Sequence, residues 1–224
     1  EYDRLNAVRV RTPGLELYGG GVDPGPNLFE APVAPEAARR EHERLVEVLE
    51  STHVEVHHPA DDLEAAGALP DLLREHVALP DGVAVDDLRA ALSPREQLGY
   101  ALARARVERT PDAASSLHVE EPISNVFFQR DTSLVGDRGP VLCEMYEPVR
   151  RPEVPIVARA WDGVGADVAH DMRDEPIEGG EFMPVGELAL LGGPADGAGE
   201  EGVIRTGYDC HLYTFDAADQ TSPS

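Results

Sequence analysis

Two short segments of the sequence carry the residue types from which a site for a cationic group could be built. The first segment runs Asn125-Val126-Phe127-Phe128-Gln129-Arg130-Asp131 and ends in an adjacent arginine and aspartate. An aspartate at a strand end can accept two N–H groups from a planar guanidinium in a charge-assisted, two-point contact. Asp131 is therefore a candidate for binding such a group. The spacing alone favours the alternative, in which Arg130 and Asp131 are surface residues on a turn.

The second segment runs Ile177-Glu178-Gly179-Gly180-Glu181-Phe182. Two consecutive glycines let the backbone turn sharply or let a ligand approach it closely. Glu178 would then lie at the lip of a strand. The alternative is that Glu178 is an ordinary turn residue, as a glutamate before two glycines usually is in an acidic protein.

The periodicity of apolar residues predicts an α/β or mixed fold, because a strand, a helix and a second strand open the chain. Between the second strand and residue 110, leucine and valine recur at helical spacings and predict two or three short helices, which we interpret as an insertion at about residues 61–110. The expected strands are residues 6–11, 53–58, 125–129, 132–136, 140–145, 181–185 and 188–192; the expected helices outside the insertion are 35–51 and 154–162; residues 19–26 are expected to be loop.

The composition excludes several classes of protein. Asp and Glu number 43 against 19 basic residues, which gives a formal net charge of −24. A field this negative repels nucleic acid and acidic lipid surfaces, so we expect neither partner. All basic residues are arginine, and an acidic surface of this kind is typical of a protein adapted to high salt, although a GC-rich genome also favours it. Two cysteines make no disulfide scaffold, and no signal peptide opens the chain, so we expect a cytoplasmic protein.

The two segments together resemble the arginine deiminase and amidinotransferase superfamily of guanidine-modifying enzymes. Residues 125–131 are similar to the family's Asn-x-x-Phe-x-Arg-Asp motif, and residues 177–180 to its Ile/Leu-Glu-Gly-Gly motif. Residues 145–153, Met-Tyr-Glu-Pro-Val-Arg-Arg-Pro-Glu, resemble an arginine-rich segment of that family. The resemblance runs to about residue 193. It implies the pentein fold, a five-bladed α/β propeller, here incomplete and carrying the small helical insertion.

The resemblance also implies roles for particular residues. Asp131 would bind the guanidinium, and Glu178 would bind its other nitrogens. Asn125 and Arg150 would position the amino-acid end, since the planar fork of an arginine matches a carboxylate. Phe128 and Arg130, from the same first motif, would complete the substrate-binding residues. We expect no metal and no cofactor.

The family's chemistry also needs a cysteine nucleophile and a histidine from a His-x-Asp segment, which we do not find after Glu178. Cys143 lies in an apolar strand and is expected to be a small buried core residue. Cys210 and His211 fall in residues 194–224, which we interpret as a non-homologous tail. Residues 209–219 resemble the translation of a sequencing-library adapter, so we interpret the tail as a sequencing artefact, with a genuine disordered tail as the alternative.

The sequence therefore predicts an arginine deiminase-like hydrolase, converting arginine and water to citrulline and ammonia in the intact parent, with this chain as an inactive fragment. The alternatives are an amidinotransferase or a methylarginine hydrolase of the same superfamily, or a non-catalytic protein that binds guanidino ligands. The expected partner is a small guanidino compound. An incomplete propeller would expose strand edges and apolar surface, so a homo-oligomer is possible.

Overall fold

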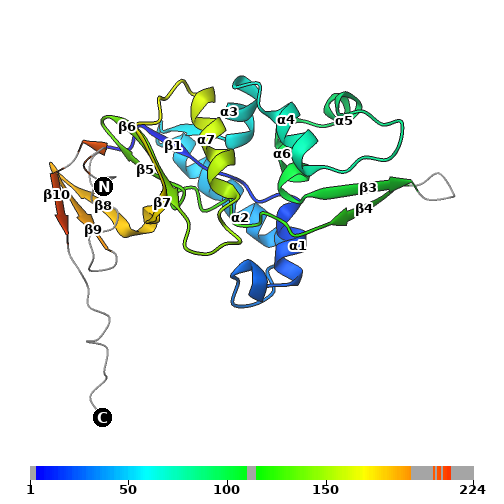
Figure 1. Ribbon diagram of the computed structural model, residues 1–224, viewed down its shortest axis with the longest axis horizontal. Helices are drawn as coiled ribbons and strands as arrows, with labels where there is room; N and C mark the ends of the chain where they lie inside the picture. The colour runs from blue at the N-terminus through cyan, green and yellow to red at the C-terminus, as the bar shows by residue number, and fades with distance from the viewer. Residues whose placement is uncertain (1–3, 110–114, 193–203, 205, 208, 213–224) are drawn as a thin grey trace, which may run out of the picture. The chain divides into compact units, whose positions relative to one another are not determined.

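The computed structural model describes residues 4–109, 115–192, 204, 206–207 and 209–212, and for residues 173–176 and 209–212 it describes the backbone alone. The chain divides into two compact units. The N-terminal unit comprises Leu5–Gln129 and Pro155–Gly165, and the C-terminal unit comprises Glu1–Arg4, Arg130–Val154 and Ala166–Ser224. Figure 1 shows the elements of both units.

The N-terminal unit is mainly helical. Its strands are β1 (Ala7–Arg9), which runs parallel to β2 (Glu55–His57), and β3 (Ala105–Arg109), which runs antiparallel to β4 (Ser115–Val119). Its helices are α1 (Glu16–Val22), η1 (Gly25–Asn27), α2 (Pro35–Ser51), α3 (Pro59–Ala65), α4 (Leu69–His76), α5 (Val85–Ala91), α6 (Pro94–Leu102) and the greater part of α7 (Glu153–Gly163).

The core of this unit is built from the leucines that the sequence places at helical spacing. Leu63, Leu72, Leu98 and Leu102 are buried together with Ile156 of α7. The helices of residues 59–102 therefore supply most of the core of the unit, since burial of such side chains is the main stabilising contribution to a fold. They number four among the described residues, against the two or three expected, because the short helix α5 separates α4 from α6.

The C-terminal unit contains two three-stranded sheets. In the first sheet, β6 (Gly139–Glu144) lies between β5 (Ser133–Gly136), which is antiparallel to it, and β7 (His170–Pro176), which is parallel. In the second, β9 (Leu188–Leu191) pairs with β8 (Phe182–Val185) and with β10 (Asp209–Leu212). The turn η2 (Gly179–Glu181) directly precedes β8. A buried cluster joins residues of both sheets: Leu134, Val141, Cys143, Met172, Ile177, Phe182, Ala189 and Leu191.

Two of the secondary-structure expectations are wrong, those for residues 19–26 and for residues 125–129. Residues 19–26 are not loop, because α1 runs through Gly19, Gly20 and Gly21. These glycines serve close packing: a Cβ on Gly20 would lie 2.5 Å from Cβ of Ser124, and a Cβ on Gly19 would lie 2.4 Å from a methyl carbon of Val119. Glycine weakens a helix by its conformational freedom, and here tertiary contacts outweigh that cost.

Residues 125–129 do not form a strand. The segment is a turn, closed by the backbone N–H of Phe128 donating to the carbonyl of Asn125 at 2.9 Å. The other expected strands and the helices of residues 35–51 and 154–162 are confirmed to within two or three residues at their ends, whereas β3, β4 and β7 were not expected. Among the described residues, no helix is long and apolar enough to cross a membrane.

The described helices and small sheets make this a mixed α/β structure. The closed five-bladed propeller stays a prediction, as does the division into residues 1–193 and 194–224. Most of the tail lies outside the described residues. Of the tail, the structure describes the backbone of Asp209–Leu212, which pairs with β9, but not the side chains of Cys210 and His211.

Candidate functional site

The two candidate carboxylates lie on neighbouring turns of the C-terminal unit. Asp131 lies in the turn that enters β5, and Glu178 lies between β7 and η2. The backbone N–H of Gly179 donates to the carbonyl of Asp131 at 2.9 Å, which ties the turns together. The two residues are therefore neighbours in space, as the resemblance implied.

Gly179 explains why the second segment carries a glycine after its glutamate. A Cβ at this position would lie 1.8 Å from the carbonyl oxygen of Arg130, a separation that no side chain can occupy. A Cβ on Gly180 would lie 3.5 Å from Oδ1 of Asp131, which is ordinary contact. The close approach expected at this glycine pair is thus made by the chain's own backbone, and it is Gly179 that allows Asp131 and Glu178 to meet.

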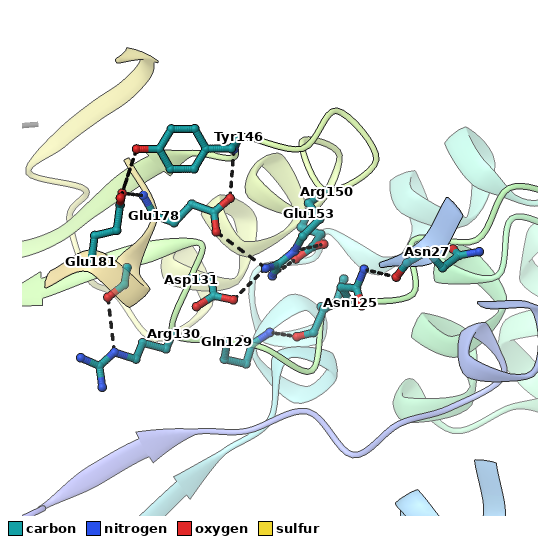
Figure 2. Close-up of polar contacts among 12 residues, drawn as sticks. Asn27, Asn125, Gln129, Arg130, Asp131, Tyr146, Arg150, Glu153, Glu178 and Glu181 are labelled. Carbon is teal, nitrogen blue, oxygen red and sulfur yellow. Dashed lines mark hydrogen bonds and ion pairs between the residues drawn. The ribbon is translucent and has the colours of Figure 1, made fainter. Parts of the chain in front are cut away.

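Arg150 lies between the two carboxylates (Figure 2). Its Nη1 donates to Oδ2 of Asp131 at 2.7 Å and lies 4.0 Å from Oε2 of Glu178. The Arg150 side chain is 9% exposed, while those of Asp131 and Glu178 are 23% and 21% exposed. The arginine is therefore buried and the two carboxylates are still reached by solvent.

Glu153 holds the other side of the Arg150 guanidinium, and the sequence analysis missed it. Arg150 donates from Nε to Oε1 of Glu153 at 2.9 Å and from Nη2 to Oε2 at 3.0 Å, the two-point geometry that suits these groups best. The Glu153 side chain is only 1% exposed. Consecutive turns, closed by N–H groups of Arg150 and Glu153, wind the chain into α7 and place these side chains three residues apart on one face.

The Arg-x-x-Glu spacing before the apolar run of α7 is the sequence signal that could have found Glu153. The burial of the Glu153 side chain cannot be read from the sequence.

Tyr146 and Glu181 were missed by the sequence analysis as well. The backbone N–H of Tyr146 donates to Oε1 of Glu178 at 3.0 Å, and the Tyr146 hydroxyl donates to the nearer carboxylate oxygen of Glu181 at 3.0 Å. The first of these contacts holds Oε1 of Glu178, and its other oxygen, Oε2, is the one that faces Arg150.

The charges of this cluster do not balance. Three carboxylates, those of Asp131, Glu153 and Glu178, surround one guanidinium, so the ionised cluster carries a net charge of −2. Burial lowers the pKa of Arg150, but its hydrogen bonds and the charges of Glu153 and Asp131 outweigh this and raise it above the ordinary value. Burial raises the pKa of Glu153 to about 7, with Asp131 and Glu178 adding to the effect against the pull of Arg150.

Oδ1 of Asp131 and Oε2 of Glu178 accept no hydrogen bond from any residue that the structure describes. A cluster with two such oxygens and an excess of negative charge can bind a further cation that donates several N–H groups. Among the described residues, no group of histidine, cysteine, aspartate and glutamate has the arrangement of a metal site.

Arg130, expected to contact a substrate, donates instead to backbone carbonyls of its own unit. Its Nε and Nη2 donate to the carbonyls of Gly179 at 3.3 Å and of Phe182 at 2.7 Å. The expectation that Cys143 is a buried core residue is confirmed, since the residue is fully buried in β6. Burial raises the pKa of Cys143 to about 12, so its thiol is not activated as a nucleophile.

Asn125 and Phe128 belong to the N-terminal unit. The Asn125 side-chain amide is buried and donates to the carbonyl of Asn27 at 3.1 Å. The Phe128 side chain is exposed, and its ring centre lies 4.3 Å from that of Phe127, which in turn stacks on Phe29. The substrate-binding roles of Asn125 and Phe128 stay predictions.

Comparison with known proteins supports the resemblance drawn from the sequence. The chain is 32% identical over 245 residues to arginine deiminase of Halobacterium salinarum, in a match that covers 86% of this chain and 50% of that protein. This match confirms the resemblance to the superfamily of guanidine-modifying enzymes that includes arginine deiminase. It spans half the length of this relative. No protein-family model matches the sequence.

Solved structures of another member of this superfamily share its fold. Dimethylarginine dimethylaminohydrolase from Pseudomonas aeruginosa, in a cysteine-to-serine variant complexed with citrulline, matches with a TM-score of 0.55 and 13% identity, over 96% of this chain and 63% of that one. A dimethylarginine dimethylaminohydrolase with a histidine-to-glycine substitution, as an adduct with S-methyl-L-thiocitrulline, matches with a TM-score of 0.54 and 14% identity, over 96% and 63% of the two chains. At this identity the likeness establishes the pentein-type fold and nothing finer.

Proposed function

We propose that this chain carries the guanidinium-binding part of an arginine deiminase-like hydrolase, which in the intact parent converts arginine and water to citrulline and ammonia. The observation that carries the proposal is the pair of solvent-accessible carboxylates, Asp131 and Glu178, in a cluster with excess negative charge. A guanidinium is a planar cation with several N–H donors, and it matches two converging carboxylates in both shape and charge.

The same two carboxylates would serve the chemistry. By holding the guanidinium from two sides they fix its central carbon for attack, and they stabilise the positive charge on its nitrogens. In the reaction that the resemblance implies, a thiolate adds to this carbon, ammonia leaves with a proton, and water then releases citrulline from the covalent intermediate. Cys143 is unsuited to this step because its thiol is buried and its pKa is raised.

For the 224-residue chain by itself we propose ligand binding rather than turnover. Arginine is the first ligand to test, since the relative at 32% identity is an arginine deiminase, and a citrulline complex exists for the enzyme from Pseudomonas aeruginosa that shares the fold.

Calorimetric titration of the chain with arginine, dimethylarginine and guanidinium chloride tests the binding proposal. Sodium chloride at equal concentration is the control for ionic strength. We expect saturable binding of at least one guanidino ligand, and heats no larger than those of the control for all three would overturn it. The parent gene product, assayed for citrulline release from arginine and dimethylarginine, then separates deiminase from methylarginine hydrolase.

We also propose adaptation to high salt, in line with the halobacterial relative and the net charge of −24. Molar salt shortens the Debye length to about 3 Å and screens the repulsion among surface carboxylates. The midpoint of thermal unfolding is therefore expected to rise steadily as potassium chloride is increased from about 0.1 M to about 2 M. A midpoint that falls or stays constant over this range would contradict the proposal.

A further inference from the structure

Glu178 is held by different contacts from those that hold Asp131. Oδ2 of Asp131 accepts a charge-assisted hydrogen bond from Arg150 at 2.7 Å. Oε2 of Glu178 lies 4.0 Å from the same nitrogen atom, which is beyond hydrogen-bonding distance. Oε1 of Glu178 instead accepts the backbone N–H of Tyr146 at 3.0 Å. The position of the Glu178 carboxylate therefore depends on the loop that carries Tyr146.

A closed ring of hydrogen bonds links Tyr146, Glu178 and Glu181 (Figure 2). The Tyr146 hydroxyl donates to Oε2 of Glu181 at 3.0 Å and lies 3.2 Å from Oε1. Oε2 of Glu181 also accepts the backbone N–H of Glu178 at 3.1 Å. The backbone of Glu178 is thus held by Glu181, and its carboxylate is held by Tyr146.

Glu181 is a fixed point in this ring, because the backbone around it is hydrogen-bonded on both sides. The Gly179 N–H donates to the carbonyl of Asp131 at 2.9 Å, and the Gly192 N–H donates to the carbonyl of Glu181 at 2.7 Å. Tyr146, in contrast, lies in the loop between β6 and α7. The contact between its hydroxyl and Glu181 ties this loop to the turn that carries Glu178.

We propose that Tyr146 and Glu181 are positioning residues, which hold the Glu178 carboxylate in place for the guanidinium of the ligand. This inference rests on the proposed guanidinium-binding function. Both oxygens of Glu181 are engaged by its own chain, so Glu181 acts as a hydrogen-bond acceptor and does not contact the ligand. A binding site needs its contact groups held in a fixed geometry by the residues around them.

Tyr146→Phe tests the proposal because it removes the hydroxyl and keeps the ring and the backbone N–H. Arginine is titrated into the wild-type chain and the variant in about 1 M potassium chloride, where the Debye length is about 3 Å and distant charges are screened. We expect the variant to bind arginine about three- to tenfold more weakly, because one hydrogen bond of the ring is lost. Equal affinity in the two proteins would overturn the inference.

Two substitutions of Glu181 separate positioning from charge. In Glu181→Gln the amide oxygen can still accept both hydrogen bonds made to Oε2, whereas Glu181→Ala removes the acceptor and the charge together. We expect Glu181→Ala to lose as much affinity as Tyr146→Phe, and Glu181→Gln to stay within about twofold of the wild type. Equal losses in Glu181→Gln and Glu181→Ala would assign the effect to charge and overturn the inference.

The double variant Tyr146→Phe, Glu181→Ala tests whether the two residues act as one unit. Its loss of affinity should equal that of the weaker-binding single variant, because either substitution alone breaks the same contact. A loss equal to the product of the two single losses would mean independent effects and would overturn the inference.

Tyr18→Phe is the matched control. Tyr18 is 40% exposed, as Tyr146 is, and its hydroxyl also donates to a glutamate, Glu36, but it lies in the N-terminal unit. We expect this variant to bind arginine as the wild type does, and a loss equal to that of Tyr146→Phe would overturn the inference. If the wild-type chain binds neither arginine nor guanidinium, it is the proposed function that fails, and the inference fails with it.

Discussion

Two buried arginines of this protein, one in each unit, are held by carboxylates in opposite ways. In the N-terminal unit, Nε of Arg9 donates to Oδ2 of Asp62 at 2.8 Å, both side chains are 7% exposed, and the guanidinium lies 3.8 Å from the ring centre of Trp161. In the C-terminal unit, Arg150 contacts three carboxylates, of which two are reached by solvent.

The direction of each pKa shift reflects this difference. Burial lowers the pKa of Arg9, and one aspartate does not make up for the lost hydration. Burial also lowers the pKa of Arg150, but its hydrogen bonds to Glu153 and Asp131 and the charges of these carboxylates outweigh burial and raise it. At Arg9 the donors are in excess: its Nη1 and the Trp161 Nε1 are buried without a partner among the described residues. At Arg150 the acceptors are in excess, and unused acceptors can bind a cationic ligand.

The comparison predicts that the Arg9 pair is a structural contact and the Arg150 cluster a binding site. Replacing Arg9 by methionine should destabilise the fold the most, by about 3–5 kcal/mol, because it leaves the buried Asp62 carboxylate without its cation. Unfolding in urea measures this. Ligand affinity, measured at a temperature where the variant is folded, should be unchanged.

Arg159→Met is the control for that experiment. Arg159 also lies on α7, but its pair with Glu75 at 3.0 Å is substantially exposed, so its loss should cost at most about 1 kcal/mol. If both variants lose the same stability, the burial of the Arg9 pair has no energetic consequence. The double variant Arg9→Met, Asp62→Leu should recover much of the loss, because no uncompensated charge then remains.

Replacing Asp131 by asparagine should weaken ligand binding strongly, with a smaller effect on folding. The amide keeps the shape but loses the charge, so we expect affinity for guanidino ligands to fall about a hundredfold, equivalent to roughly 2.7 kcal/mol. Calorimetric titration measures the affinity, and the thermal midpoint reports the fold. Retention of near wild-type affinity in a folded Asp131→Asn variant would remove Asp131 from the site.

Gly179 and Gly180 provide a matched pair for the geometry that joins the two carboxylates. Gly179→Ala should cost about 2 kcal/mol of stability, as overpacking does, because its Cβ would collide with the Arg130 carbonyl and separate Asp131 from Glu178. Gly180→Ala places its Cβ at ordinary contact distance and should change stability and ligand affinity little. Equal effects of the two substitutions would contradict the structure at this turn.

Glu153 should make stability depend on pH in a particular direction. Its pKa in the folded protein is raised to about 7 by burial, with Asp131 and Glu178 adding to the effect of burial and Arg150 opposing it. A raised carboxyl pKa means that the folded state binds the proton more tightly, so the stabilising contribution is present at low pH and is lost as the pH rises from about 4.5 toward 7.

The difference in unfolding free energy between the wild type and Glu153→Gln should therefore fall by about 1–2 kcal/mol between pH 5 and pH 7.5. Denaturant unfolding at both pH values measures it, and taking the difference cancels the carboxylates that the two proteins share. A difference that is constant or that grows with pH would show that Glu153 is not held as the structure has it.

The sequence by itself named the residues that we propose carry the chemistry. The Asn-x-x-Phe-x-Arg-Asp and Ile-Glu-Gly-Gly patterns were sufficient to identify the superfamily and to name Asp131 and Glu178, because such patterns are local and keep their spacing in the sequence. Apolar periodicity likewise predicted α2, α7 and the strands β5, β6, β8 and β9, since each of these elements has a regular pattern of its own.

Tertiary structure decided what these residues contact. Gly19 and Gly20 of α1 were expected to be loop, but they make room for Val119 and Ser124, which lie far along the chain. The segment around Phe127 was taken for a strand, although it forms a turn stacked on Phe29. The spacing of Arg150 and Glu153 could be read from the sequence, but not that Glu153 is buried. Burial and charge balance depend on residues distant in sequence, so only the tertiary structure shows that three carboxylates surround Arg150.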